Sequence, residues 1–368
     1  MQNNNGNLLN NRNNNWLKQI ISGSNKVYIV LIGIIVLSII LAFSYFANWT
    51  NMMNVLVNVS LFGGIAAIGM TFVIISGGID LSVAAVMAFA ANILCNFYNY
   101  SKVGHMSQGM GIFITLLIVF GVAFLIGAAN GAMITYLKLE PFIVTLGTMT
   151  LLYGVNLWTT QGRTINGVFN VFNYIGTGSF TWLNTGRFFF GPVQGEAAKQ
   201  VIFKIPLIPI IFIIFCVIFY IILKKSVYGR HIFAVGGNPD AAKLSGIKVD
   251  QNRMITYILC ALLAAVNGLL LASWTKAYAP NMTYGFELDI IAAVIIGGTV
   301  LSGGYGSIGG TIAGLVILQI LYNMINLGVD LSTYGINWSW APATYVRQFI
   351  KGIIIIGAVI MQGRTSKK

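Results

Sequence analysis

The sequence predicts an all-α polytopic membrane protein with about ten transmembrane helices, some of them short or broken. Of its 368 residues, 57% are hydrophobic and only 8% are charged, whereas soluble domains carry about 25% charged residues. The mean hydropathy is +0.81, and apolar runs long enough to cross a bilayer core, about 20 residues each, recur along the chain. This composition excludes a soluble enzyme.

Ten apolar segments are candidate spans. They are Val27–Ala47, Met53–Ile75, Leu81–Phe97, Gly111–Leu137, Phe142–Thr160, Ile205–Leu223, Met254–Ser273, Leu288–Leu301, Gly309–Leu327 and Tyr345–Met361. Segments 81–97 and 288–301 are short, and each adjoins a Ser-Gly-Gly break, at 76–78 and 302–304. Irregular backbone at membrane depth needs protein or a water-filled cavity to satisfy it. The breaks therefore indicate either part of a transport pathway or ordinary cytoplasmic turns.

The basic residues predict the orientation. Residues 1–26 are expected to form a disordered Asn-rich tail, residues 27–363 the transmembrane domain, and residues 364–368 a second tail. Thirteen of the 21 basic residues fall on one face: Arg12, Lys18, Lys26, Lys138, Lys224, Lys225, Arg230, Lys243, Lys248, Arg253, Arg364, Lys367 and Lys368. The positive-inside rule makes that face cytoplasmic, with both termini, and puts loop 161–204 outside. The positive charge thus indicates orientation in a lipid bilayer and not nucleic-acid binding.

The cytoplasmic loop 224–253 carries the signals of a short helix. Asn238 is a good N-cap, Pro239 suits the first helical position, and Asp240 lies where the helix dipole favours an acid. Gly246 is placed to end the helix in a left-handed conformation. The expected helix has roughly two turns, about 10 Å. Because so short a helix is marginal alone in water, it needs a surface to pack against.

The chain shows no catalytic or metal-binding pattern. The two histidines fall in loops, and the three cysteines lie inside apolar segments without metal spacing. The Gly-rich stretch 302–310 lacks the Lys-Ser/Thr of a phosphate loop. We therefore expect no enzyme activity, no metal and no cofactor in this chain.

Polar groups inside or beside the spans are the candidates for a pathway or gate. They are Asn58, Asp80, Asn130, Asn267, Glu287, Asp289, Ser302, Gly303 and Gly304. Asp80 suits an N-cap of the third helix or a gate. Glu287 and Asp289 are about 200° apart on a helix, so they cannot share one face. Either both are first-turn acids that complement the helix dipole, or one of them faces the outer mouth of the pathway. The amides either join helices or line a path for a neutral polyhydroxylated solute.

Five motifs occur in collinear order: Ile75–Ser82 (ISGGIDLS), Pro141–Met149 (PFIVTLGTM), Gly236–Ile247 (GGNPDAAKLSGI), Tyr284–Ala293 (YGFELDIIAA) and Gly297–Gly306 (GGTVLSGGYG). Together they resemble the permease subunits of bacterial ABC importers for monosaccharides, the ribose, xylose and galactose/methyl-galactoside group, with a lean toward the galactoside branch. The resemblance covers about residues 27–365.

The resemblance implies a homodimer of permeases in the bacterial cytoplasmic (inner) membrane. It also implies a separate cytoplasmic ATPase that binds ATP and Mg, and an extracytoplasmic sugar-binding protein. The loop that would dock on the ATPase contains Gly229, Gly236, Asn238, Pro239, Asp240, Ala241, Ala242, Ser245 and Gly246. The alternatives are an importer permease for a nucleoside, a branched-chain amino acid or a furanosyl signal, and a stand-alone secondary sugar carrier. The spans are poor in the buried acids that ion-coupled carriers use, so the energy is expected to come from outside the chain.

Overall fold

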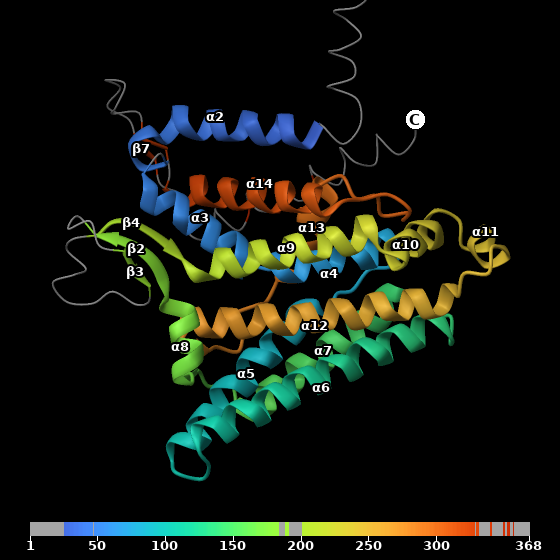
Figure 1. The fold of residues 1–368 in the computed structure, drawn as a ribbon, viewed down its shortest axis with the longest axis horizontal. Helices are drawn as coiled ribbons and strands as arrows, with labels where there is room; N and C mark the ends of the chain where they lie inside the picture. The colour runs from blue at the N-terminus through green and yellow to red at the C-terminus, as the bar shows by residue number, and fades with distance from the viewer. Residues whose placement is uncertain are drawn as a thin grey trace, which may run out of the picture.

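Long helices run roughly side by side, and short strands gather at one end of the molecule (Figure 1). The computed structural model describes residues 26–46, 48–183, 188–190, 201–327, 329–330 and 339–340, with isolated positions between 349 and 356. Among these residues, six helices are long and apolar enough to cross a membrane, or seven if the bent pair α3 and α4 is one span. The expected total of ten and the cytoplasmic position of both termini remain predictions.

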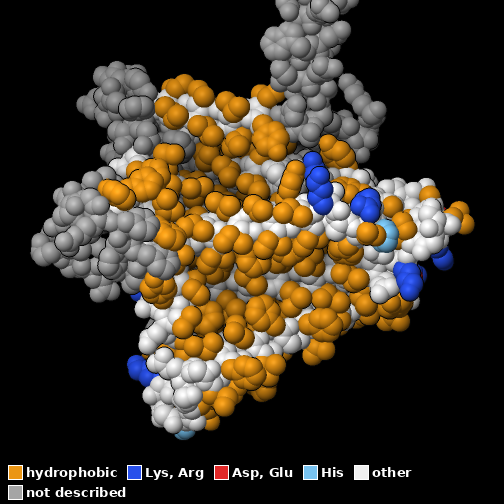
Figure 2. Space-filling model, in the orientation of Figure 1, with side chains coloured by type: hydrophobic (Ala, Val, Ile, Leu, Met, Phe, Trp, Pro, Cys, Tyr) orange, Lys and Arg blue, Asp and Glu red, His pale blue; other side chains and the backbone are white. Residues whose placement is uncertain are grey.

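The helices follow one another along the chain with few long connections. They are α2 (Lys26–Phe46), α3 (Trp49–Leu61), α4 (Gly64–Ile75), α5 (Val83–Lys102), α6 (Gln108–Thr135), α7 (Pro141–Thr160), α8 (Asn170–Thr177), α9 (Leu207–Lys225), α10 (Val227–Gly237), α11 (Pro239–Leu244), α12 (Val249–Thr275), α13 (Phe286–Ile296) and α14 (Ile308–Leu327). Figure 2 shows hydrophobic side chains spread over one face of them, with most of the visible Lys and Arg at the end that carries α10 and α11.

The described part of the chain is mostly helical, as expected, and three small antiparallel sheets accompany the helices. Their strands are β1 (Ile165–Asn166), β2 (Ser179–Leu183), β3 (Phe188–Phe190), β4 (Val201–Pro206), β5 (Ala277–Tyr278), β6 (Val329–Asp330) and β7 (Ser339–Trp340). They pair as β1–β5, β3–β2–β4 and β6–β7. The described part of loop 161–204 therefore contains strands and the helix α8, which sequence reasoning did not assign.

Three predicted spans differ from the helices observed. Segment 53–75 is broken into α3 and α4, which are bent by 46°. Segment 81–97 is not short, because α5 runs on to Lys102 through polar residues. Segment 288–301 is shorter than expected, because α13 ends at Ile296, before Gly297 and the positive-φ Gly298. The expected span 345–361 and most of the two tails lie outside the described residues.

Helix α12 lies at the centre of the fold and packs against α4, α5 and α6. Glycines allow these helices to approach closely. A Cβ at Gly127 of α6 would lie 2.5 Å from Ile258 Cα, and one at Gly69 of α4 would lie 2.7 Å from Cys260 Cα. Small residues at such contacts are typical of helix packing in membranes, where close van der Waals contact replaces the hydrophobic effect.

The break between α3 and α4 is satisfied by one buried amide of α12. Asn267 Nδ2 donates to the Leu61 carbonyl at 2.7 Å, and Asn267 Oδ1 accepts from the N–H groups of Ile65 at 2.9 Å and Ala66 at 3.2 Å. Helix ends carry backbone groups without intrahelical partners, and inside a membrane each of them needs one. A single fully buried side chain thus serves the end of one half-helix and the start of the next.

We predict that Asn267→Leu destabilises the protein by about 1–3 kcal/mol, because three buried backbone groups lose their partner. The measurement is thermal unfolding of the purified chain in detergent. Asn54→Leu, on the exposed side of α3, is the matched control and should unfold at or above the wild-type temperature. An equal unfolding temperature for Asn267→Leu and the wild type would contradict the role assigned to the amide.

Candidate transport site

The two Ser-Gly-Gly breaks predicted from sequence meet in space. The N–H of Gly304 donates to the carbonyl of Ile75, the last residue of α4, at 2.9 Å. Gly236, near the end of α10, packs on the same carbonyl, because a Cβ there would lie 1.7 Å from Ile75 O and 2.5 Å from Gly304 N. Gly303 and Gly304 both have positive φ. We call Gly236, Gly303 and Gly304 around the Ile75 carbonyl the glycine junction.

The segment after the junction folds as its residues predict. Asn238 Oδ1 accepts from the N–H of Ala241 at 3.0 Å and caps α11, Pro239 occupies its first turn, and Gly246 has φ +81°. Ala242 is buried, whereas Leu244 is 91% exposed. Sequence reasoning missed α10, which precedes α11 and begins at Val227.

Three other expected coupling residues have structural places in α10 and α11. The N–H of Gly229 donates to Ser226 Oγ, the N-cap of α10, at 3.0 Å. Asp240 lies in the first turn of α11, and Ser245 is its C-cap residue. The Ser245 hydroxyl donates to the Ala241 carbonyl at 2.9 Å. These contacts stabilise α10 and α11, and none of them involves the exposed side chain of Leu244.

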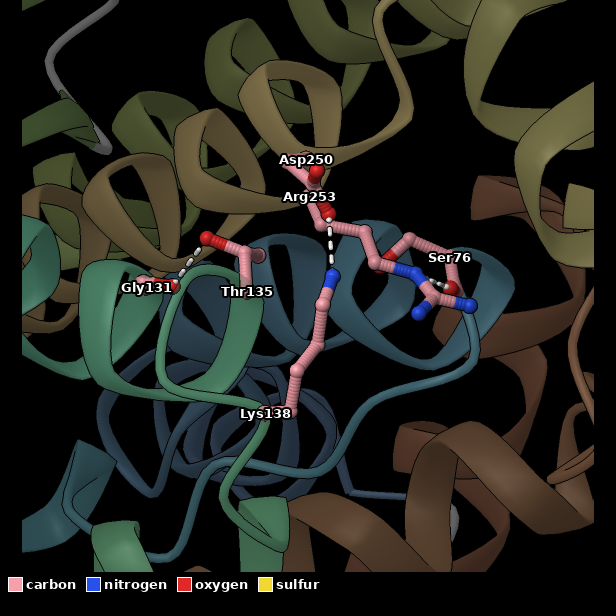
Figure 3. A network of polar contacts seen from close by, with 6 residues as sticks. All are labelled: Ser76, Gly131, Thr135, Lys138, Asp250 and Arg253. Atoms are coloured by element: carbon pink, nitrogen blue, oxygen red, sulfur yellow. Dashed lines mark hydrogen bonds and ion pairs between the residues drawn. The ribbon is translucent and has the colours of Figure 1, made fainter. Parts of the chain in front are cut away.

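Charged side chains connect the same end of the molecule to α4 and α6 (Figure 3). Arg253, in the second turn of α12, donates from Nε to the Ser76 carbonyl at 3.1 Å, one residue beyond the junction. Asp250 pairs with Lys138, after α6, at 3.0 Å. The second pair is exposed, so it contributes only about 0–1 kcal/mol. Neither contact was predicted, because the two partners of each pair, Ser76 with Arg253 and Lys138 with Asp250, are far apart in sequence.

One of the two expectations for Asp80, that it is the N-cap residue of the following helix, is wrong. The N-cap position of α5 belongs to Ser82, and Asp80 Oδ1 accepts from the Ser82 N–H at 2.9 Å and its hydroxyl at 2.6 Å. Asn130 of α6 donates to Ser82 Oγ at 3.1 Å and accepts from Thr148 of α7 at 2.6 Å. Burial raises the pKa of Asp80. Two expected pathway residues, Asp80 and Asn130, thus belong to one polar cluster.

The acids of α13 lie in its first turn and are both buried. Glu287 accepts from the Gly285 N–H at 3.2 Å, and Asp289 accepts from the Tyr322 hydroxyl of α14 at 3.0 Å. Because α13 begins next to Phe62, with ring centroids of Phe62 and Phe286 5.1 Å apart, this end of α13 adjoins the α3–α4 break. Both acids lie in the first turn, as expected, and the alternative that one of them faces the outer mouth of the pathway stays a prediction.

The remaining candidates are Asn58 and Ser302. Asn58 is half-buried on α3, and its carbonyl accepts from the Phe62 N–H at 2.9 Å, at the end of that helix. Ser302 is exposed beside the glycine junction. Within the described residues, no group of three or more His, Cys, Asp or Glu side chains is placed to hold a metal ion.

The bundled apolar helices, one of them a broken span, define a multi-pass membrane protein. The family described as "Branched-chain amino acid transport system / permease component" matches residues 51–359, and the chain belongs to this family. No solved structure matches it.

Curated relatives match over most of their length. The ribose import permease protein RbsC of Bacillus subtilis is 34% identical over 316 residues, which cover 86% of this chain and 85% of that protein. The galactose/methyl galactoside import permease protein MglC of Salmonella typhimurium is 33% identical over 350 residues, 94% of each. RbsC of Haemophilus influenzae is 36% identical over 293 residues, 78% of this chain and 81% of that protein.

We predict that Gly236→Ala lowers solute uptake at least tenfold, because the added Cβ has to displace the Ile75 carbonyl or Gly304. The control is the next residue, since a Cβ at Gly237 meets nothing within 4 Å, and Gly237→Ala should transport as the wild type does. Uptake is measured in cells and divided by the amount of chain in the membrane. Equal uptake by both variants would show that the close contact at Gly236 is dispensable.

Proposed function

We propose that this chain is the membrane-spanning permease subunit of an ATP-driven importer for a monosaccharide of the ribose or galactose/methyl galactoside type. One observation carries the proposal, namely identity of about one third to sugar import permeases over as much as 94% of both chains. The described spans supply amides, hydroxyls and small residues, which suits a neutral polyhydroxylated solute. In this assignment the chain carries no enzyme activity and no cofactor of its own.

The geometry of α11 supports a separate ATPase as the source of energy. The helix projects at the end of the molecule where the visible basic side chains gather, which the positive-inside rule makes cytoplasmic. Its Leu244 is 91% exposed, and through Gly236 the segment before it contacts the end of α4. A partner that binds α11 and hydrolyses ATP with Mg could therefore move the end of a broken helix.

Two further partners complete the proposal. A second copy of the chain would enclose the pathway, and the apolar faces of α6 and α7 remain exposed in the single chain. The importer would lie in the bacterial cytoplasmic membrane. An extracytoplasmic sugar-binding protein would deliver the substrate to the end of the chain opposite α11. The family's description names branched-chain amino acids, so an amino acid is the competing substrate in the test.

We predict that Leu244→Asp lowers uptake at least tenfold and abolishes co-purification of the ATPase, because a carboxylate replaces the exposed apolar contact. Ala242 is a poorer choice, since it is buried at 4% exposure and its replacement also disturbs α11. Val103→Asp, exposed after α5 at the other end, is the control and should retain both properties. Normal ATPase retention and uptake in Leu244→Asp would exclude this docking site.

The substrate is tested by deleting the gene for this chain and restoring it on a plasmid. We expect uptake of labelled ribose or galactose to disappear on deletion and to return with the wild-type chain. Leucine uptake should not change. Loss of leucine uptake without loss of sugar uptake would overturn the sugar assignment. Sugar exchange by the purified chain alone in liposomes would instead favour a stand-alone carrier.

A further inference from the structure

An open pocket of about 510 Å³, lined mostly by polar residues, lies at the end of the molecule opposite α11. Its lining includes Asn99 at the end of α5, Trp158 and Thr159 at the end of α7, and Arg163 and Asn166 beyond it. Helix α12 starts just after α11 and ends at strand β5, which pairs with β1 beside the pocket. Its 27 residues correspond to about 40 Å, so the pocket and α11 lie on opposite sides of a bilayer.

The lining chemistry matches a neutral polyhydroxylated ring. Amides and hydroxyls both donate to and accept from sugar hydroxyls, and the lining carries one cation and no acid. Trp158 is 79% exposed and offers a flat apolar surface with a polar edge. The volume falls within the range of about 300–1,000 Å³ found for small-molecule sites.

A relay of amides, formed by Asn96, Asn92 and Asn156, adjoins this pocket through Thr159. Asn96 Nδ2 donates to the side chain of Asn92, and Asn92 Nδ2 donates to Asn156 Oδ1 at 3.0 Å and to Thr159 Oγ1 at 2.7 Å. Thr159 also lines the pocket. The same side chain therefore belongs to the pocket wall and to the relay.

The relay ends in a donor without an acceptor. Asn92 and Asn156 are completely buried, and Asn156 Nδ2 has no hydrogen-bond partner among the described residues. In this arrangement Asn92 donates to Asn156 Oδ1, which leaves the Asn156 NH₂ as the unpaired end of the relay. Leaving a buried donor unpaired is costly. Asn156 lies one helical turn, about 5.4 Å, below Thr160 at the pocket wall.

We propose that this pocket is an external binding subsite for the transported monosaccharide, where Trp158 stacks on the ring, Thr159 bonds to a hydroxyl, and Asn156 Nδ2 offers the next hydrogen bond inward. The inference rests on the proposed function, because it takes its solute and its orientation from that assignment. It adds residues of α5 and α7 that neither the motifs nor the coupling segment point to. The bilayer-interface role of an exposed Trp explains neither the pocket nor the directed relay.

The test is protection of an engineered cysteine by sugar. Thr164→Cys places an exposed thiol in the pocket lining, while the three natural cysteines are buried. Right-side-out vesicles that contain the full importer are treated with a membrane-impermeant maleimide. We expect ribose or galactose to slow labelling at least threefold, and inorganic phosphate to have no effect. Val103→Cys, exposed at the same end but outside the lining, should label equally with and without sugar.

A second substitution tests the relay. With Thr159→Val added to the reporter, the sugar concentration for half-protection should rise about tenfold, and Thr159→Ser should restore it because the hydroxyl returns. Trp274→Phe, on α12 and outside the lining, should leave the concentration unchanged.

Four outcomes would overturn the proposal: no protection by sugar, protection by phosphate instead, labelling only from the cytoplasmic side, or equal half-protection in Thr159→Val. Uptake is measured on the same vesicles. If they take up sugar without protection, the subsite alone is wrong. If sugar uptake does not depend on this chain, the proposed function is wrong as well.

Discussion

A helix that breaks inside a membrane has to find partners for its open backbone groups, and in this protein one amide meets that requirement. Asn267 donates to the end of α3 and accepts from the start of α4, with water excluded on all sides. Because water cannot replace it at that depth, the position of α12 fixes where the break lies. The other close contacts of α12, through Gly69 of α4 and Gly127 of α6, hold these two helices in register with that amide.

Later segments of the chain contact α4 at the end that lies away from the break. As a half-helix, α4 stops at Ile75, and its terminal carbonyls face the segment that leads into α11. Gly304 and Arg253 bond to the carbonyls of Ile75 and Ser76, so two later parts of the chain close the end of the helix. Side chains at Gly236 or Gly303 would separate these backbones, which explains why glycine occupies both positions.

Local signals predicted local structure well. Asn238, Pro239 and Gly246 act within one short segment, and α11 forms where they predict a helix. The break in 53–75 carried only a Gly-Gly pair, and the side chain that satisfies it comes from about 200 residues later in the chain. The extension of α5 beyond residue 97 has the same cause, since Asn99 Nδ2 bonds to the Asn166 carbonyl. Sequence reasoning identified Asn267 and Gly304 as candidates, but only the fold shows which backbone groups they meet.

The two sides of the helix bundle, the one with α11 and the one with the pocket, use different kinds of contact, and the difference fits the roles proposed for them. Near α11, backbone groups touch through glycines, so a displacement of one segment has to be followed by the next, because close-packed contacts do not compress. At the opposite end, Asn92, Asn156 and Thr159 are joined by side-chain hydrogen bonds, which can exchange one partner for another at little net cost. Rigid contact suits the transfer of movement from an ATPase, and exchangeable hydrogen bonds suit a solute whose hydroxyls replace one partner after another.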